Sequence, residues 1–167
     1  SPLPSQGRHY DAAMRLAALR HDGSLDMDRL LADTVGQQQA GGRRVRGLLM
    51  TWPDGAAACG AMVLNDIEQG HHYLVSQDLG AGSTGCRVDP QGFARASEVL
   101  RRALAETPPP DLVVINRFGG LEAAGEGLID ELSALLAADI PVLTAVADKH
   151  AEAWARFSGD LPRLPPD

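Results

Sequence analysis

The chain has 167 residues, of which 44% are hydrophobic but only 4% aromatic, so it suits one domain with an aliphatic core. A formal net charge of −7 argues against a nucleic-acid partner, since binding to the phosphate backbone requires a basic surface. Two cysteines do not make a disulfide scaffold and no apolar run reaches membrane length, so we expect no membrane partner and a cytoplasmic location. The pattern predicts an extension over residues 1–13, a single domain over residues 14–158 and a proline-rich tail over residues 159–167.

The first half of the chain predicts a strand, a helix, a second strand and a hairpin. Ser24 or Asp26 is expected to cap the helix, and Gly41-Gly42 ends it. The apolar residues of this helix recur at helical spacing, at Met27, Leu30, Leu31 and Val35. The strands are expected over residues 14–19 and 45–50, and the antiparallel hairpin over residues 57–65 and 71–76.

The second half alternates helices with strands. Asp89-Pro90 predicts the start of a helix, with proline in its first turn. The buried stripe of that helix is expected to consist of Phe93, Ala96, Val99, Leu100 and Leu104. There follow a strand over 112–116, a helix over 128–138, a strand over 140–146, and a short helix with Trp154 and Phe157 that Asp148 is expected to cap. This alternation predicts an α/β fold in three layers, with helices on both faces of a mostly parallel sheet and one antiparallel hairpin.

The segment 111–127 carries the strongest functional signal. Its apolar run, residues 112–115, is typical of a buried parallel strand, and an open α/β sheet binds ligands at the carboxyl ends of its strands. The candidate ligand-binding residues there are Asn116, Arg117, Gly119, Glu122 and Glu126, with His21 at the end of the first strand. A structural alternative stays open, in which Asn116 turns the backbone and Arg117 pairs with one of the glutamates.

A second signal lies in the glycine-rich segment 76–90. Glycines allow successive N–H groups to face one way and form an anion nest, to which hydroxyl donors and an arginine add. The candidates are Ser83, Thr84, Gly85, Cys86 and Arg87. The alternative is a surface loop with local hydrogen bonds, but loops of this length in compact domains are usually functional or disordered.

The features of an active nucleotide hydrolase are missing. A P-loop needs Gly-x-x-x-x-Gly-Lys-Ser/Thr, whereas residues 20–28 contain one glycine and no lysine. Asn116-Arg117 stands where such a hydrolase would place an Mg²⁺-binding aspartate. The basic clusters Arg43-Arg44-Arg46 and Arg101-Arg102 are expected to form a solvated face.

Two long motifs resemble a known family. Ser-Gln-Asp-Leu-Gly-x-Gly-Ser-x-Gly-Cys-Arg-x-Asp-Pro at 76–90 and Val-Ile-Asn-Arg-Phe-Gly-x-Leu-Glu-Ala-x-Gly-x-Gly at 114–127 look like signatures of an uncharacterised bacterial domain family. That family is often encoded beside molybdate-transport or nitrogenase genes. It is similar, more distantly, to the thermophilic nucleoside-triphosphatase family, which implies a P-loop-NTPase-like scaffold.

These observations favour an oxyanion-binding protein over an enzyme, with molybdate or tungstate as the expected ligand for storage, delivery or sensing. Residues 83–87 would form one wall of the site and Asn116-Arg117 the other. The sequence leaves two alternatives open: a nucleoside triphosphate phosphohydrolase in which Glu122 or Glu126 activates water, and a regulatory interaction module without a small ligand. Strand edges that need cover predict a homo-oligomer.

Overall fold

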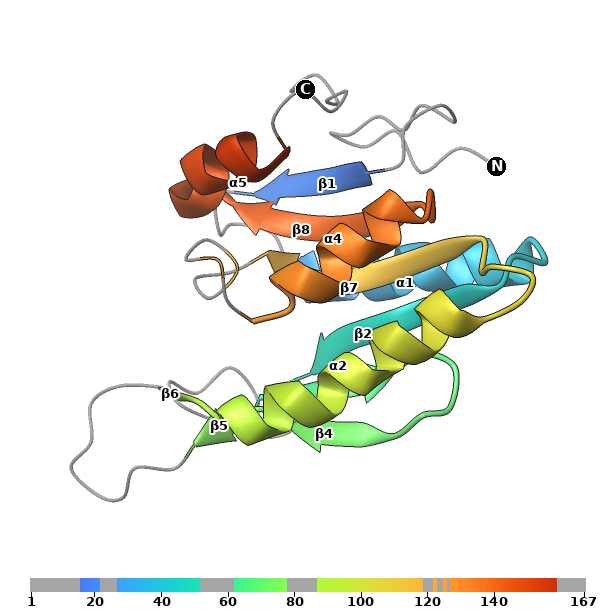
Figure 1. Cartoon of the computed structure of the whole chain (residues 1–167), viewed down its shortest axis with the longest axis horizontal. Helices are drawn as coiled ribbons and strands as arrows, with labels where there is room; N and C mark the ends of the chain where they lie inside the picture. The colour runs from blue at the N-terminus through green and yellow to red at the C-terminus, as the bar shows by residue number, and fades with distance from the viewer. Residues whose placement is uncertain are drawn as a thin grey trace.

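A six-stranded sheet forms the centre of the protein (Figure 1). The computed structural model describes residues 16–21, 27–51, 62–77, 87–118, 122, 125 and 127–158, with backbone alone at 20, 21, 76, 77, 87, 88, 117 and 158. In spatial order the strands are β1 (Leu16–His21), β8 (Val142–Ala147), β7 (Leu112–Phe118), β2 (Val45–Thr51), β3 (Val63–Asp66) and β4 (His72–Leu74). The first four are parallel, and β3 and β4 are antiparallel to their neighbours. A separate two-stranded ribbon joins β5 (Ser76–Gln77) to β6 (Arg87–Val88).

Helices cover both faces of the sheet, as the sequence predicts. Helix α1 (Met27–Ala40) packs on one face, while α2 (Pro90–Ala105) and α4 (Ile129–Ala137) pack on the other (Figure 1). A 3-10 turn, η1 (Asp148–His150), leads into the last helix, α5 (Ala151–Ser158). Within the described part of the chain, no helix is long and apolar enough to cross a membrane.

The predicted start and apolar stripe of α2 are confirmed. Asp89 is the N-cap, and its carboxylate accepts a hydrogen bond from the Gln91 N–H at 3.0 Å, with Pro90 opening the first turn. Of the predicted stripe, Ala96, Val99 and Leu100 are buried, and Phe93 and Leu104 pack half-buried against the core. In α1, Met27, Leu31 and Val35 are buried as predicted.

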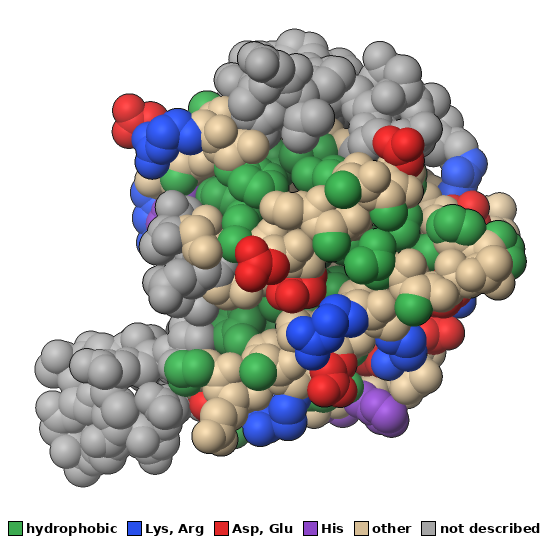
Figure 2. Space-filling view, viewed as in Figure 1, with side chains coloured by type: hydrophobic (Ala, Val, Ile, Leu, Met, Phe, Trp, Pro, Cys, Tyr) green, Lys and Arg blue, Asp and Glu red, His purple; other side chains and the backbone are tan. Residues whose placement is uncertain are grey.

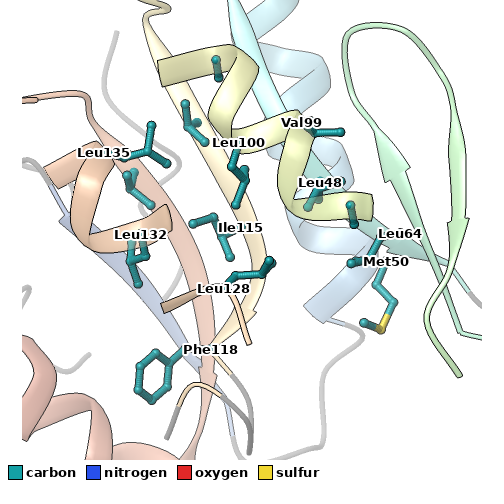
Figure 3. Close-up of a cluster of buried hydrophobic side chains, with 14 of the residues drawn as sticks. Leu48, Met50, Leu64, Val99, Leu100, Ile115, Phe118, Leu128, Leu132 and Leu135 are labelled. Carbon is teal, nitrogen blue, oxygen red and sulfur yellow. The ribbon is translucent and has the colours of Figure 1, made fainter. Parts of the chain in front are cut away.

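The sheet divides the hydrophobic core into two clusters. The larger one lies between the sheet and the α2/α4 layer and includes Leu48, Ile115, Phe118 and Leu132 (Figure 3). The smaller one lies under α1 and includes Leu31, Val114 and Leu143. Strand β7 contributes to both clusters, which confirms that residues 112–115 form a strand buried on both faces.

Several predicted boundaries differ from the structure. Strand β1 extends to His21 because its pairing with β8 continues to Ala147, and β7 continues two residues beyond Asn116. The hairpin pairs only residues 63–65 with 72–74, and residues 57–61 lie outside the described part. The predicted cap of the last helix by Asp148 is wrong, because Asp148 lies inside the helical segment, one residue after its N-cap Ala147.

An ion-pair network joins several elements at the amino edge of the parallel strands. Arg46 donates to Glu106 at 2.5 Å, and Arg44 pairs with the same carboxylate. Arg102 donates to the fully buried Asp66 carboxylate at 2.6 Å. These arginines are partly buried and paired, so the expected solvated face is wrong for them; Arg46 keeps only 17% of its side chain exposed.

Candidate functional site at the carboxyl edge of the sheet

The four parallel strands end at the carboxyl edge of the sheet, where the sequence predicts the ligand-binding site. The register aligns Arg20 of β1 with Val146 of β8, and Val146 with Phe118 of β7, so these residues form one row across the sheet. His21 follows in the next row, opposite Ala147. With about 4.8 Å between neighbouring strands, the backbones of Arg20 and Phe118 lie about 10 Å apart. The structure therefore brings His21 and the end of β7 to the same edge, and it adds Arg20.

A β-bulge interrupts the β7–β8 ladder at Asn116-Arg117. Ile115 pairs with Thr144 and Phe118 pairs with Val146, so β7 has one more residue than β8 in this interval. The extra residue changes which face the chain presents. Ile115 and Phe118 both belong to the cluster beneath α2 and α4, although residues three apart in a regular strand point to opposite faces (Figure 3).

Asn116 connects three elements through its side chain. It is 2% exposed; its Oδ1 accepts the Met50 N–H of β2 at 2.9 Å, and its Nδ2 donates to Asp28 Oδ1 in the first turn of α1 at 3.0 Å. The bonds span 66 and 88 residues of sequence, so neither is a local turn interaction. The Asn116 side chain therefore bonds to protein groups far away in the sequence, which is a different structural role from the local turn that the sequence left open.

Glu122 is also buried and bonded to the backbone. The residue is 6% exposed, and its Oε2 accepts the Leu128 N–H at 2.9 Å. Leu128 is the N-cap of α4 and has no side-chain cap of its own, so Glu122 supplies an acceptor at this helix start. Its charge also complements the positive end of the helix dipole.

The other predicted site residues are described only in part or lie outside the described residues. Arg117 occupies the bulge, and Arg87 lies in β6, each with its backbone described. The undescribed candidates are Ser83, Thr84, Gly85, Cys86, Gly119 and Glu126. In the described ranges, no three His, Cys, Asp or Glu side chains gather into a metal-binding group.

The β5–β6 ribbon lies at the carboxyl edge of the sheet, as the end of β7 does, but it is attached to the sheet beside β4. The Val75 N–H donates to Met62 O at 2.9 Å, and the Asp89 N–H donates to Val75 O at 2.9 Å, which fixes the ribbon beside the end of β4. Three strand spacings, about 14 Å, separate β4 from β7. The two predicted walls are therefore not adjacent at their bases.

An aromatic cluster supports the end of β7. Phe118 is 1% exposed, and its ring packs edge-on against Trp154 of α5 at a centroid distance of 5.1 Å. Phe157 completes the cluster, 5.8 Å from Phe118. The sequence predicts the helix with Trp154 and Phe157, but not that it packs directly beside the bulge.

Sequence reasoning considered the segment 20–28 but did not name Arg20 or Asp28 among the candidate ligand-binding residues of this edge. Arg20 could have been found from its position one residue before His21 in the same strand. Asp28 lies in the first helical turn after that strand, where carboxylates are common, and nothing local in the sequence indicates its bond to Asn116.

The strand order, the helices on both faces and the loops at the carboxyl edge define an α/β protein with a P-loop-NTPase-like fold. A solved structure, the solution structure of a human cancer-related nucleoside triphosphatase, is similar over 89% of this chain and 87% of that one, with a TM-score of 0.68 and 17% sequence identity. The family model described as "Protein of unknown function (DUF2478)" matches residues 16–167, so the chain belongs to that family. The expected membership of an uncharacterised family is confirmed, and the link to neighbouring genes stays a prediction.

A curated relative is also similar in sequence. The molybdenum import ATP-binding protein ModC 2 of Bradyrhizobium diazoefficiens is 40% identical over 148 residues, which cover 88% of this chain. The chain spans 16% of the length of that relative. The similarity therefore concerns one segment of a longer protein.

Proposed function

We propose that this protein binds a tetrahedral oxyanion, molybdate or tungstate, at the carboxyl edge of its sheet. The observation that carries the proposal is the row formed by Arg20, Val146 and Phe118, together with the bulge at Arg117. The backbones of Arg20 and Arg117 therefore lie at one edge of the sheet, on either side of the end of β8. Arginine suits an oxyanion because its guanidinium group forms charge-assisted, often bidentate hydrogen bonds to anionic oxygens.

The surroundings of this row favour an anion. Helices α1 and α4 follow β1 and β7 along the chain and run back across the sheet, so both begin at the carboxyl edge. The positive ends of helix dipoles and the free N–H groups of first turns stabilise negative charge. The name of the curated relative supports molybdenum, whose simple anion in water, molybdate, is tetrahedral.

The phosphate chemistry of an active hydrolase has less support. The first turn of α1 carries Asp28 where a P-loop would carry its lysine and hydroxyl residue, and Asn116 occupies the end of the central strand. A carboxylate at this position repels a polyphosphate. Nucleotide hydrolysis is the second candidate, favoured by the fold that this chain shares with a nucleoside triphosphatase.

The second predicted wall can take part in the site only if its loop reaches β7. This wall consists of Ser83, Thr84, Gly85, Cys86 and Arg87. The loop over residues 78–86 begins and ends at the ribbon, so its tip can extend about 15 Å at most, at roughly 3.4 Å per residue. This length matches the distance of about 14 Å to β7. A ligand that touches both walls therefore requires the loop to fold back over β2 and β3.

A binding panel tests the proposal. Melting temperatures and calorimetric titrations are measured with molybdate, tungstate, sulfate, phosphate, and ATP or GTP with and without Mg²⁺. A specific ligand at 100-fold over its dissociation constant stabilises the fold by about 2.7 kcal/mol. Arg117→Ala should weaken binding of molybdate about tenfold or more, because a charged hydrogen bond is lost. Arg95→Ala, at an exposed position of α2, is the matched control and should leave it unchanged.

Each alternative predicts a different result from the panel. Stabilisation by Mg²⁺-nucleotide alone would support the hydrolase, and equal stabilisation by sulfate and phosphate would show a general anion site. No stabilisation by any of these compounds would support the interaction module. The variant pair Ser83→Ala/Thr84→Ala separately tests the second wall: unchanged molybdate affinity would remove residues 83–87 from the site.

A further inference from the structure

We infer that Asn116 is a positioning residue for the proposed oxyanion site: its buried amide holds the β7 bulge, and with it the backbone of Arg117, against β2 and α1. The inference rests on the proposed function, since it assigns how that site is held in shape. It differs from the ligand-binding role that the sequence predicts for Asn116, because both halves of the amide contact protein groups.

On the β2 side, Asn116 continues the sheet where the backbone ladder stops. The β2–β7 pairing ends at Leu48 opposite Ile115. Two residues further along β2, the Met50 N–H donates to the Asn116 side chain. The side chain thus replaces a ladder bond that the bulged backbone of β7 does not make, and it holds the two strands together up to the bulge.

On the far side of the bulge, Phe118 fixes the chain again. It pairs with Val146 of β8, and its ring is buried against Trp154 and Phe157. Arg117 therefore lies between two immobilised neighbours. A binding residue whose backbone is fixed before the ligand arrives loses less conformational entropy on binding, and its affinity is higher.

The bond to Asp28 explains why the residue is asparagine. An amide offers both an acceptor and donors, so one side chain can accept from Met50 and donate to Asp28. An ionised aspartate offers acceptors only. Asn116→Asp would keep the bond to the Met50 N–H, lose the bond to Asp28 and place two carboxylates in contact.

The repulsion between the two carboxylates should make the binding defect of Asn116→Asp depend on pH. A general loss of stability would not produce this pH dependence. Two carboxylates in contact raise the pKa of the pair, so one proton binds as the pH falls and restores a donor between positions 116 and 28. Asn116→Asp should bind dilute molybdate about tenfold more weakly than the wild type at pH 8. The difference should shrink towards pH 5.5, with the wild type titrated in parallel to correct for protonation of the anion.

Asn65→Asp is the matched control. The Asn65 amide donates to Leu49 O at 3.2 Å and Thr51 Oγ1 at 2.9 Å, so it contacts the same end of β2 from β3 without touching the bulge. Its molybdate affinity should equal that of the wild type at every pH. Equal loss of affinity in Asn65→Asp and Asn116→Asp, or an Asn116→Asp defect that does not depend on pH, would overturn the positioning role.

A second readout separates this inference from the proposed function. Trp154 contacts Phe118, so its emission, measured in a Trp52→Phe background, reports on the end of β7 without any ligand. Asn116→Asp should shift the Trp154 emission at pH 8 and restore it at pH 5.5, whether or not molybdate binds. If wild-type protein does not bind molybdate but the emission follows this profile, the proposed function fails and the structural part of the inference holds. An emission that is unchanged at both pH values would refute the inference itself.

Discussion

Gly47 marks a place in the sheet where no side chain fits. It lies in β2 opposite Val114 of β7, with φ at 116°, a backbone conformation that L-residues rarely adopt. A Cβ built on Gly47 would lie 2.0 Å from Val114 O and 2.8 Å from Val114 N. In Gly47→Ala the two strands would have to separate by at least about 1 Å, at the centre of the six-stranded sheet.

The cost of Gly47→Ala follows from these contacts. Backbone strain of this kind costs roughly 1–3 kcal/mol, and each weakened ladder bond adds about 1 kcal/mol. With two such bonds the loss is about 3–5 kcal/mol, before any loosening around the buried Leu48 and Val114. That is a large part of the roughly 5–15 kcal/mol that stabilises a typical domain. The melting temperature should fall by about 10 °C or more, or the variant should not fold.

Gly36→Ala is the control for this prediction. Gly36 lies in α1, and a Cβ built there has no atom within 4 Å. Removing glycine from a helix interior stabilises it by roughly 0.5–1 kcal/mol, so the melting temperature should rise by a few degrees. Thermal and urea unfolding followed by circular dichroism compare the two variants with the wild type. A Gly47→Ala protein that melts within about 2 °C of the wild type would refute the reasoning about the β2–β7 contact.

Three further predictions concern charge and turnover. The hydrogen bond from Arg46 lowers the pKa of Glu106 despite its burial, so its stabilising effect is present at neutral pH and lost as the pH falls through that lowered pKa; Glu106→Gln should therefore melt below the wild type at pH 7 and converge with it in acid. Burial raises the pKa of Glu131, so its ionised form costs stability; Glu131→Gln should melt above the wild type at pH 7, and the difference should vanish as the pH falls through the raised pKa. Purified protein should show no Mg²⁺-dependent ATP or GTP turnover above a boiled control, and a rate on the order of 1 s⁻¹ would contradict the binding-protein proposal.

The features that the sequence predicts well depend on neighbouring residues. The capped start of α2 follows from Asp89-Pro90, and the burial of β7 follows from four consecutive apolar residues. The position of the end of β7 at the carboxyl edge follows from the parallel arrangement of the strands, while the ligand site expected there stays a prediction. Each of these inferences uses a pattern that is complete within a few residues.

The features that the sequence did not predict depend on two distant segments at once. The bulge at Asn116-Arg117 is defined by the pairing of β7 with β8, so the sequence of β7 alone contains no sign of it. The bond from Asn116 to Asp28 joins residues 88 positions apart, and Arg44 meets Glu106 across 62 positions. Hydrophobic periodicity carries no information about such polar pairs, because any of several carboxylates could satisfy each donor.

Several arginines of the basic clusters have carboxylate partners in the fold. At the amino edge, Arg44 and Arg46 share Glu106, and Arg102 is bonded to Asp66, so these three arginines of the basic clusters are paired with carboxylates. On the face shown in Figure 2, acidic and basic side chains also lie beside one another. Arg101 forms long ion pairs with Glu98 and Glu131.

At the carboxyl edge, the backbone places Arg20 and Arg117 near the ends of β1 and β7, two strands apart. A net charge of −7 does not prevent anion binding at such a place, because at physiological salt charges more than about 8 Å away are largely screened. The potential that a small anion meets is therefore set by the groups that line the edge itself. In our proposal, the row of Arg20, Val146 and Phe118 across this edge favours an oxyanion, and the density of arginines along the sequence does not enter the argument.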